Sequence, residues 1–341
     1  MKNVTGFMRI ANAIIHKRRI INTHFAGSPC TEKWDASDKY SLCDTAVLHK
    51  DEGRDFVILN ITDPHFSDYD IRAFMAFAAT RTIKRLVRDI KPDLITVTGD
   101  IVCGGSTEYS IRRFTALMDS FSTPWAPVFG NHDAETNCDY NYLADIMLKS
   151  PHCLMKKGDP RLGCGNYVVN IASSRDESII HSLIMTDTHK THLSDSQIQW
   201  YKWAALGVSE ANGRKTESSV MMHIPCAEYQ YAYDAAYDEK NVCWREGFEA
   251  SGSLNEKICC HRDKSGEPVN NGFFAAVKET GSTKNIICGH EHMNDFSILY
   301  DGVRLTYTLK AGRGSGFMKG MNGGTKITVS DAGLSIQHIY I

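Results

Sequence analysis

Five short motifs in this sequence carry side chains that could bind metal ions. They are Asp63-Pro64-His65, Gly99-Asp100, Gly130-Asn131-His132-Asp133, His223 and Gly289-His290-Glu291-His292. Imidazole and carboxylate side chains together favour Zn, Fe or Mn over Ca or Mg. Two such ions about 3.5–4 Å apart can hold a phosphoryl group between them and generate a hydroxide near neutral pH. The residue types therefore suit a centre of two metal ions that acts on phosphoesters.

Each motif taken alone also has an ordinary structural interpretation. Asp-Pro-His can be a turn, Gly-Asp is a common strand end, and a single histidine such as His223 is more often a satisfied core residue. Gly-Asn-His-Asp could be a turn, and Gly-His-Glu-His could be a surface loop. The metal-binding interpretation depends on all five motifs occurring together, each behind an apolar run.

The elements that must position these motifs are predicted to be buried strands. Apolar runs predict strands over 56–62 and 94–98 and a short strand that ends at Phe129, and two later core strands end at His223 and Gly289. Helices predicted over 71–90 and 107–121 separate the first three strands, which favours parallel pairing through crossover helices. Ligands bind outside the carboxyl ends of strands in open α/β sheets. We therefore expect the five motifs to line one crevice.

The remaining chain contains further strands and one long irregular segment. Strands are predicted over 166–171 and 180–186, a capping box of Ser194 and Gln197 opens a helix through Leu206, and residues 296–341 are rich in β signals. The segment 225–283 is polar, rich in tyrosine and bracketed by motif residues. Such a long connection is commonly functional. It is predicted to be a substrate-side cap, and the alternative is a surface excursion with its own small core.

Composition indicates an ordinary globular protein. The 341 residues carry a formal net charge of −2, so no general attraction to nucleic acid or to an anionic membrane is expected. The sequence contains no run of eighteen apolar residues, so no transmembrane helix is expected. The basic start, residues 1–21, is interpreted as a mature N-terminus, with a transit-like peptide as the alternative. Eleven irregularly spaced cysteines without C-x-x-C indicate reduced thiols and a cytoplasmic location.

The order of the motifs resembles that of the calcineurin-like metallophosphoesterases. The resemblance covers roughly residues 55–310, and the set of motifs is specific. Finer features resemble the single-domain group related to purple acid phosphatases and Dcr2-type phosphatases. These features are Thr62–Phe66, His223–Pro225, Asn271–Phe274, Gly289–Asp295 and the glycine-rich stretch Gly312–Phe317.

The resemblance implies two metal sites and a histidine that acts on the substrate. One ion would be held by Asp63, His65 and His292, and the other by Asn131, His223 and His290, with Asp100 bridging both. His132 would not be a ligand and would donate a hydrogen bond or a proton to the substrate phosphate. Asp133 would orient His132 through the other ring nitrogen.

The resemblance also implies the fold and the reaction. The expected fold is a four-layer α-β-β-α sandwich of two mixed sheets flanked by helices, with residues 55–341 as the catalytic domain and 1–54 as an extension. The expected reaction is hydrolysis of a phosphomonoester, on a small molecule or a phosphoprotein, by in-line attack of metal-bound hydroxide. Phosphodiesters, including cyclic nucleotides, are the alternative substrates, and a non-catalytic scaffold is the alternative of another class. Neither nucleic acid nor a membrane is expected as a partner.

One position departs from the family pattern, and several other residues keep open interpretations. The common G-D-x-x-D would place aspartate where this chain has Cys103, and purple acid phosphatases have an iron-binding tyrosine there. The metal identity, Mn, Fe or Zn, therefore stays open. Arg313 could contact substrate phosphate or be a solvated turn residue, and Asp187 could line the crevice or cap a strand. A zinc site at Cys243, Cys259, Cys260 and His261 is not favoured, because the spacing matches no zinc module.

Overall fold

The computed structural model describes residues 23–67, 70–105, 107–135, 137–188, 190–313 and 316–341. The basic stretch 1–21, on which the prediction of a mature N-terminus rests, lies outside these residues. Among the described residues no helix is long and apolar enough to cross a membrane. Each of the eleven cysteines is a free thiol.

A five-stranded sheet carries the first three motifs. Its strand order is β15 (Gly333–Tyr340), β14 (Gly323–Ser330), β2 (Phe56–Ile61), β3 (Leu94–Thr98) and β4 (Trp125–Val128). Strands β2, β3 and β4 are parallel, and β14 and β15 extend the sheet antiparallel. Their crossover helices are α2 (Asp70–Ile90) and α3 (Thr107–Asp119), and α4 (Tyr140–Met147) follows β4. The strands and helices predicted for this half are confirmed.

An eight-stranded mixed sheet carries the last two motifs. Its order is β1 (Ala46–Lys50), β5 (Tyr167–Ser173), β6 (Ile179–Met185), β7 (Ser218–Met221), β11 (Thr283–Cys288), β13 (Val303–Tyr307), β12 (Ser297–Tyr300) and β10 (Ala250–Ser251). Strands β6, β7, β11 and β13 run parallel. The accompanying helices are α5 (Asp195–Ala211), α6 (Glu228–Ala236) and α7 (Phe273–Thr280). The capping box of Ser194 and Gln197 opens α5 as predicted.

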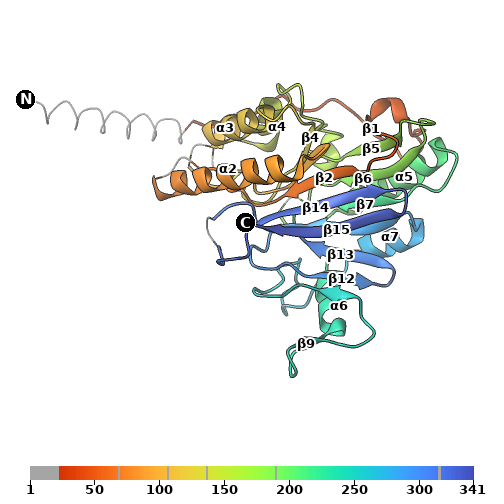
Figure 1. Ribbon diagram of the computed structural model, residues 1–341. Helices are drawn as coiled ribbons and strands as arrows, with labels where there is room; N and C mark the ends of the chain where they lie inside the picture. The colour runs from red at the N-terminus through yellow and green to blue at the C-terminus, as the bar shows by residue number, and fades with distance from the viewer. Residues whose placement is uncertain (1–22, 68–69, 106, 136, 189, 314–315) are drawn as a thin grey trace, which may run out of the picture.

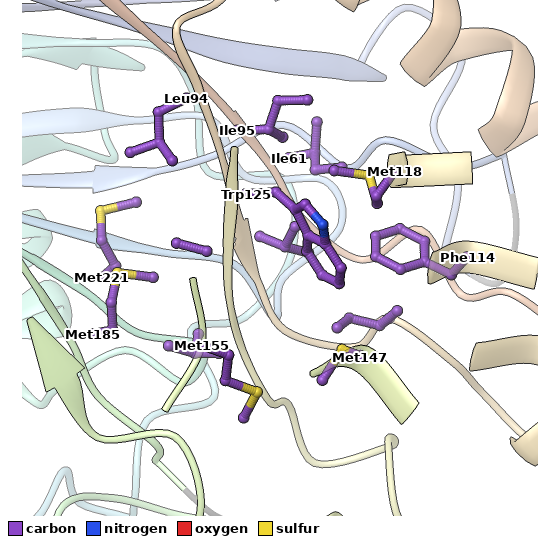
Figure 2. Close-up of a cluster of buried hydrophobic side chains, with 14 of the residues drawn as sticks. Ile61, Leu94, Ile95, Phe114, Met118, Trp125, Met147, Met155, Met185 and Met221 are labelled. Atoms are coloured by element: carbon purple, nitrogen blue, oxygen red, sulfur yellow. The ribbon is translucent and has the colours of Figure 1, made fainter. Parts of the chain in front are cut away.

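The two sheets pack face to face and hold the larger hydrophobic core between them. Figure 1 shows α2 and α3 beside the five-stranded sheet and α5 and α7 beside the other. Figure 2 shows Trp125 next to Phe114 and Met118 of α3, with Met185 and Met221 of the second sheet nearby. A second core lies under α5, α6 and α7. The predicted four-layer sandwich of two mixed sheets is confirmed.

The predicted N-terminal extension contributes a strand to the fold. Strand β1 pairs in parallel with β5, with Ala46 opposite Val169 and Lys50 opposite Ser173. Residues 46–50 therefore belong to the eight-stranded sheet. Further upstream, the backbone of Phe25 bridges to Cys138, and the Phe25 ring stacks on Tyr142 of α4. Gly27 N–H donates to Asp139 Oδ1 at 3.0 Å, just before α4 begins. The described part of the extension therefore packs on the domain that follows it.

Candidate metal centre

The backbone at four of the predicted ligands lies in the left-handed region. Asp63 and His65 follow β2 with φ of 51° and 48°, Asp100 follows β3 with φ of 50°, and His290 follows β11 with φ of 78°. This region is uncommon for residues other than glycine, and such strain gathers at functional sites. Each strand therefore ends in a turn that redirects the next side chain into the crevice between the sheets.

Glycines beside the ligands allow the motif backbones to approach one another closely. A Cβ at Gly99 would lie 2.5 Å from His223 Nδ1, and Gly99 also has a φ of 86°. A Cβ at Gly130 would lie 2.2 Å from Asp100 Oδ1. Any side chain at either position would displace a predicted ligand, which explains why both motifs begin with glycine.

One group of ligand atoms comes from three of the motifs. Asp63, His65, Asp100 and His292 each offer an atom, and these atoms lie within 4.8 Å of one another. His65 Nε2 and His292 Nε2 are 3.2 Å apart, and Asp63 Oδ1 is 3.4 Å from the first and 3.2 Å from the second. Except for His292, these side chains are buried. The predicted set for the first metal site is thus assembled.

A second group shares Asp100 with the first. Asp100, His223 and His290 also offer ligand atoms within 4.8 Å of one another. His223 Nε2 lies 3.4 Å from Asp100 Oδ1 and 3.1 Å from Asn131 Oδ1. The two groups meet at Asp100, whose two oxygens face opposite histidines, His65 and His223. This arrangement suits a carboxylate that bridges two ions.

Neighbouring backbone groups and a threonine fix the orientation of these side chains. His223 Nδ1 donates to the carbonyl of Thr98 at 2.8 Å, which leaves Nε2 to face the crevice. Asp63 Oδ2 accepts from the Thr62 hydroxyl at 2.7 Å and from His290 N–H at 3.0 Å. The remaining oxygen, Asp63 Oδ1, faces His65 and His292. Each of these ligand atoms is therefore held toward one shared space.

The pKa values of the crevice histidines are shifted by burial and by the nearby carboxylates. Burial lowers the pKa of His65 to about 4 and that of His290 to about 4, so both rings are neutral near pH 7, the form that binds metal. Burial would also lower the pKa of His223, but Asp100 outweighs it and raises that pKa to about 10. Asp100 therefore favours positive charge at this end of the crevice.

Two unsatisfied contacts show that the donor set fits metal ions. Asp100 Oδ2 is buried and has no hydrogen-bond partner among the described residues. The facing Nε2 atoms of His65 and His292 can share only one proton at 3.2 Å. A cation in the first group would pair with this carboxylate oxygen and with the ring nitrogens of His65 and His292.

His132 lies beside this space, and its ring contacts Glu135 rather than Asp133. His132 Nδ1 is 2.5 Å from Glu135 Oε1, and Nε2 is 3.9 Å from Asp100 Oδ2. Asp133 is fully buried, and its oxygens accept from the N–H groups of Val102 and Gly130. The orienting contact predicted for Asp133 is therefore made by Glu135, and Asp133 instead ties the loops after β3 and β4 together.

Sequence reasoning missed two residues next to the centre. Glu135 stands three residues after His132 in a turn, a spacing that could have suggested the contact. Lys310 is buried and donates from Nζ to the carbonyl of Asp63 at 2.8 Å, and burial lowers its pKa to about 8. No motif marks Lys310 in the sequence, because it reaches Asp63 only through the pairing of distant segments.

The other candidate residues take different places. Cys103 Sγ lies within 4.8 Å of ligand atoms of His132 and Glu135, outside both groups that contain Asp100. Asp187 is fully buried and accepts from Cys164 N–H at 3.1 Å. Arg313 borders a hollow beside α2. Among the described residues, Cys243, Cys259, Cys260 and His261 belong to no group of three potential metal ligands.

The family model for calcineurin-like phosphoesterases matches residues 56–294, which is more than half of the chain. The chain belongs to this family. The matched range begins at β2 and ends just after His292, so it contains all five motifs. The resemblance inferred from the motifs is therefore confirmed.

Two curated relatives of this chain carry phosphatase names. The chain is 22% identical to the Arabidopsis thaliana protein named "Probable inactive purple acid phosphatase 14" over 82% of this chain and 72% of that protein. It is 26% identical to the Saccharomyces cerevisiae phosphatase Dcr2 over 74% of this chain and 46% of the relative. The chain thus spans less than half of the yeast phosphatase.

A solved structure shares the fold. The Danio rerio dimetal phosphatase superposes with a TM-score of 0.54 at 12% sequence identity, and the match covers 83% of this chain and 95% of that chain. At this level of identity the comparison supports the four-layer architecture and nothing finer.

Proposed function

We propose that this protein hydrolyses phosphate monoesters with two bound metal ions. Asp63, His65 and His292 would hold one ion. Asn131, His223 and His290 would hold the other, and Asp100 would bridge the two. The metal would be Mn, Fe or Zn, because the donors combine imidazole nitrogen with carboxylate oxygen.

The convergence of seven donor side chains from five strand ends carries this proposal. A protein that kept the fold only as a scaffold would have no reason to retain a complete set. It would also have no reason to hold Asp63, His65, Asp100 and His290 in a strained backbone conformation. The name of the Arabidopsis relative contains the word inactive, so activity must be measured for this chain.

The ions, when bound, would neutralise charge on the phosphoryl oxygens and lower the pKa of a water molecule. The chain supplies the second part of the chemistry through His132, whose side chain is 35% exposed and so faces arriving substrate. Glu135 accepts from Nδ1, which leaves Nε2 on the side of Asp100. When the ring is protonated on both nitrogens, Nε2–H can donate a hydrogen bond or a proton to a substrate oxygen from this side.

Monoesters are the favoured class because the relatives carry phosphatase names, and phosphodiesters are the alternative. The test is a kinetic comparison of an aryl phosphate with a bis-aryl phosphate. The chelated protein would be reloaded separately with Mn²⁺, Fe²⁺ or Zn²⁺. We expect no turnover without metal and a higher kcat/KM for the monoester with at least one metal. A higher kcat/KM for the diester would establish a phosphodiesterase, and no turnover with any metal would favour the scaffold.

A further inference from the structure

A basic hollow lies on the exposed face of α2. Arg81, Lys84, Arg85 and Arg88 follow the spacing i, i+3, i+4 and i+7, which places them on one face of the helix. They border a hollow of about 570 Å³ together with Arg313 and the exposed ring of Phe77. That volume falls within the usual range for ligand sites, roughly 300–1,000 Å³.

The positive charge of this hollow is largely uncompensated. Asp89 forms ion pairs with Arg85 at 3.6 Å and with Arg88 at 2.8 Å, so one carboxylate serves two guanidinium groups. Arg81, Lys84 and Arg313 form no ion pair with any described residue. The whole chain carries a formal net charge of −2. Five cations around one concavity are therefore a local feature, and they attract an anionic partner.

Gly312 and Gly316 lie beside the metal centre, and Arg313 borders the hollow. A Cβ at Gly312 would lie 3.0 Å from the carbonyl of Pro64, which stands between two predicted ligands. A Cβ at Gly316 would lie 2.4 Å from His292 Nδ1. Arg313, which borders the hollow, lies between these two contacts in the sequence. Gly316 thus lies against a predicted metal ligand, and Arg313, three residues earlier, forms part of the wall of the hollow.

We propose that the hollow binds an acidic polypeptide segment of a phosphoprotein substrate whose phosphorylated residue reaches the metal centre. The inference rests on the proposed phosphatase function and adds the substrate class. Arginine and lysine side chains pair with the carboxylates of such a segment. The exposed ring of Phe77 offers an apolar contact beside them. A chain segment can fill a concave surface, whereas a flat bilayer contacts protruding side chains.

The first experiment compares two phosphopeptides and an aryl phosphate as substrates. One peptide carries acidic residues around the phosphorylated residue, and the other carries neutral residues there. The wild-type protein should show a lower KM for the acidic peptide, and that advantage should fade at high salt, which screens exposed charges. The variant is Arg81→Ala/Lys84→Ala/Arg88→Ala, which keeps good helix formers on α2.

The variant should raise KM for the acidic peptide about tenfold. Each exposed charge pair contributes little by itself, but the variant removes three of them together. The KM for the neutral peptide and all values for the aryl phosphate should stay unchanged. The matched control, Lys149→Ala/Arg175→Ala/Lys215→Ala, removes three exposed charges elsewhere and should behave as wild type. An equal KM of wild type for both peptides, or an equal effect of the two triple variants, would overturn the proposal.

A binding experiment separates this proposal from the proposed function. Fluorescence anisotropy would measure the affinity of the acidic peptide with its phosphorylated residue replaced by alanine, so that no hydrolysis is needed. Wild type should bind it more tightly than the α2 variant does. If wild type binds the peptide but hydrolyses no phosphoester, the proposed function fails while the acidic site stands. If the α2 variant instead loses only binding to phosphatidylserine vesicles, the hollow is a membrane contact and the proposal is wrong.

Discussion

The metal crevice can be recognised from its sequence, whereas the role of the neighbouring segment 225–283 cannot. In the crevice, the chemistry of metal binding limits each position to a few residue types, and a strand precedes each one. In the segment, the aromatic residues serve packing. Tyr229 is fully buried, and the rings of Tyr233, Trp244 and Phe296 contact one another. Chemistry therefore leaves a motif that can be recognised, whereas packing of this kind does not.

The segment also forms hydrogen bonds with the loop that carries His290 and His292. Asn294 Oδ1 accepts from the N–H groups of Asn255 and Glu256, and Asn294 Nδ2 donates to the carbonyl of Glu256. Glu256 Oε1 in turn accepts from Met293 N–H, and Glu291 Oε1 accepts from Cys259 N–H. These bonds hold the loop that carries His290 and His292. The polar part of the segment thus supports the metal site through the backbone of the histidine loop.

The largest effect is expected inside the crevice, at the residue that both ion sites share. Asp100→Asn keeps the shape of the side chain but removes the charge that both ions would use. Activity should fall to background, and bound metal should drop below that of wild type, as measured by elemental analysis of purified protein. Wild-type turnover in this variant would show that Asp100 is not the bridge.

The next effect separates a ligand from a residue that acts on the substrate. His132→Ala should lower kcat about 10²–10⁴-fold, the usual contribution of general acid–base catalysis, while metal content stays at the wild-type level. Glu135→Gln should lower kcat less, because the amide oxygen can still accept from Nδ1. If metal content falls in His132→Ala, the ring is a ligand and the separation is wrong.

A smaller effect tests the contact between the two regions. Asn294→Ala removes three of the bonds between the segment and the histidine loop, those with Asn255 and Glu256. Metal affinity should weaken about 10–100-fold, as is typical when partners of metal ligands are lost. At saturating metal, kcat should return to within a few-fold of wild type. Asn241→Ala, an exposed site in the same segment, is the control and should leave metal affinity unchanged.

The smallest effect concerns the aromatic part of the segment. The Tyr229 hydroxyl lies 2.8 Å from the carbonyl of Ile286 and accepts from Thr306 N–H at 3.2 Å. Tyr229→Phe leaves these buried groups with fewer partners, so the free energy of unfolding should fall by about 1–3 kcal/mol. Denaturant unfolding measures this loss. Relative kcat/KM values for different substrates should stay the same. A change in their ratio would show that Tyr229 influences substrate choice.

Much of the fold could be predicted because its signals are local. Apolar runs marked β2 and β3, and Ser194 with Gln197 marked the start of α5. Strand β1 was not predicted, because Ala46–Lys50 has no strong apolar run and forms a strand only by pairing with β5. The pairing of β14 with β2, which closes the first sheet, likewise depends on contacts between distant residues.

The residues of the candidate site could be predicted from the sequence, but their hydrogen-bond partners could not. The seven donor residues were recognised by type and order, and the structure brings them together. The orienting partner of His132 was assigned to Asp133 by resemblance, yet the carboxylate of Asp133 accepts from Val102 and Gly130 N–H groups. Such second contacts depend on loop geometry, which the residue types alone do not determine.

The central claim is that the crevice holds two metal ions, and metal stoichiometry tests it most directly. Wild-type protein, chelated and then reloaded, would be freed of excess metal and measured by elemental analysis in parallel with the His223→Ala variant. We predict two ions per chain in wild type, about one in His223→Ala, and aryl phosphate turnover that rises with the second ion. Wild-type protein without stoichiometric metal under every loading condition would contradict the account.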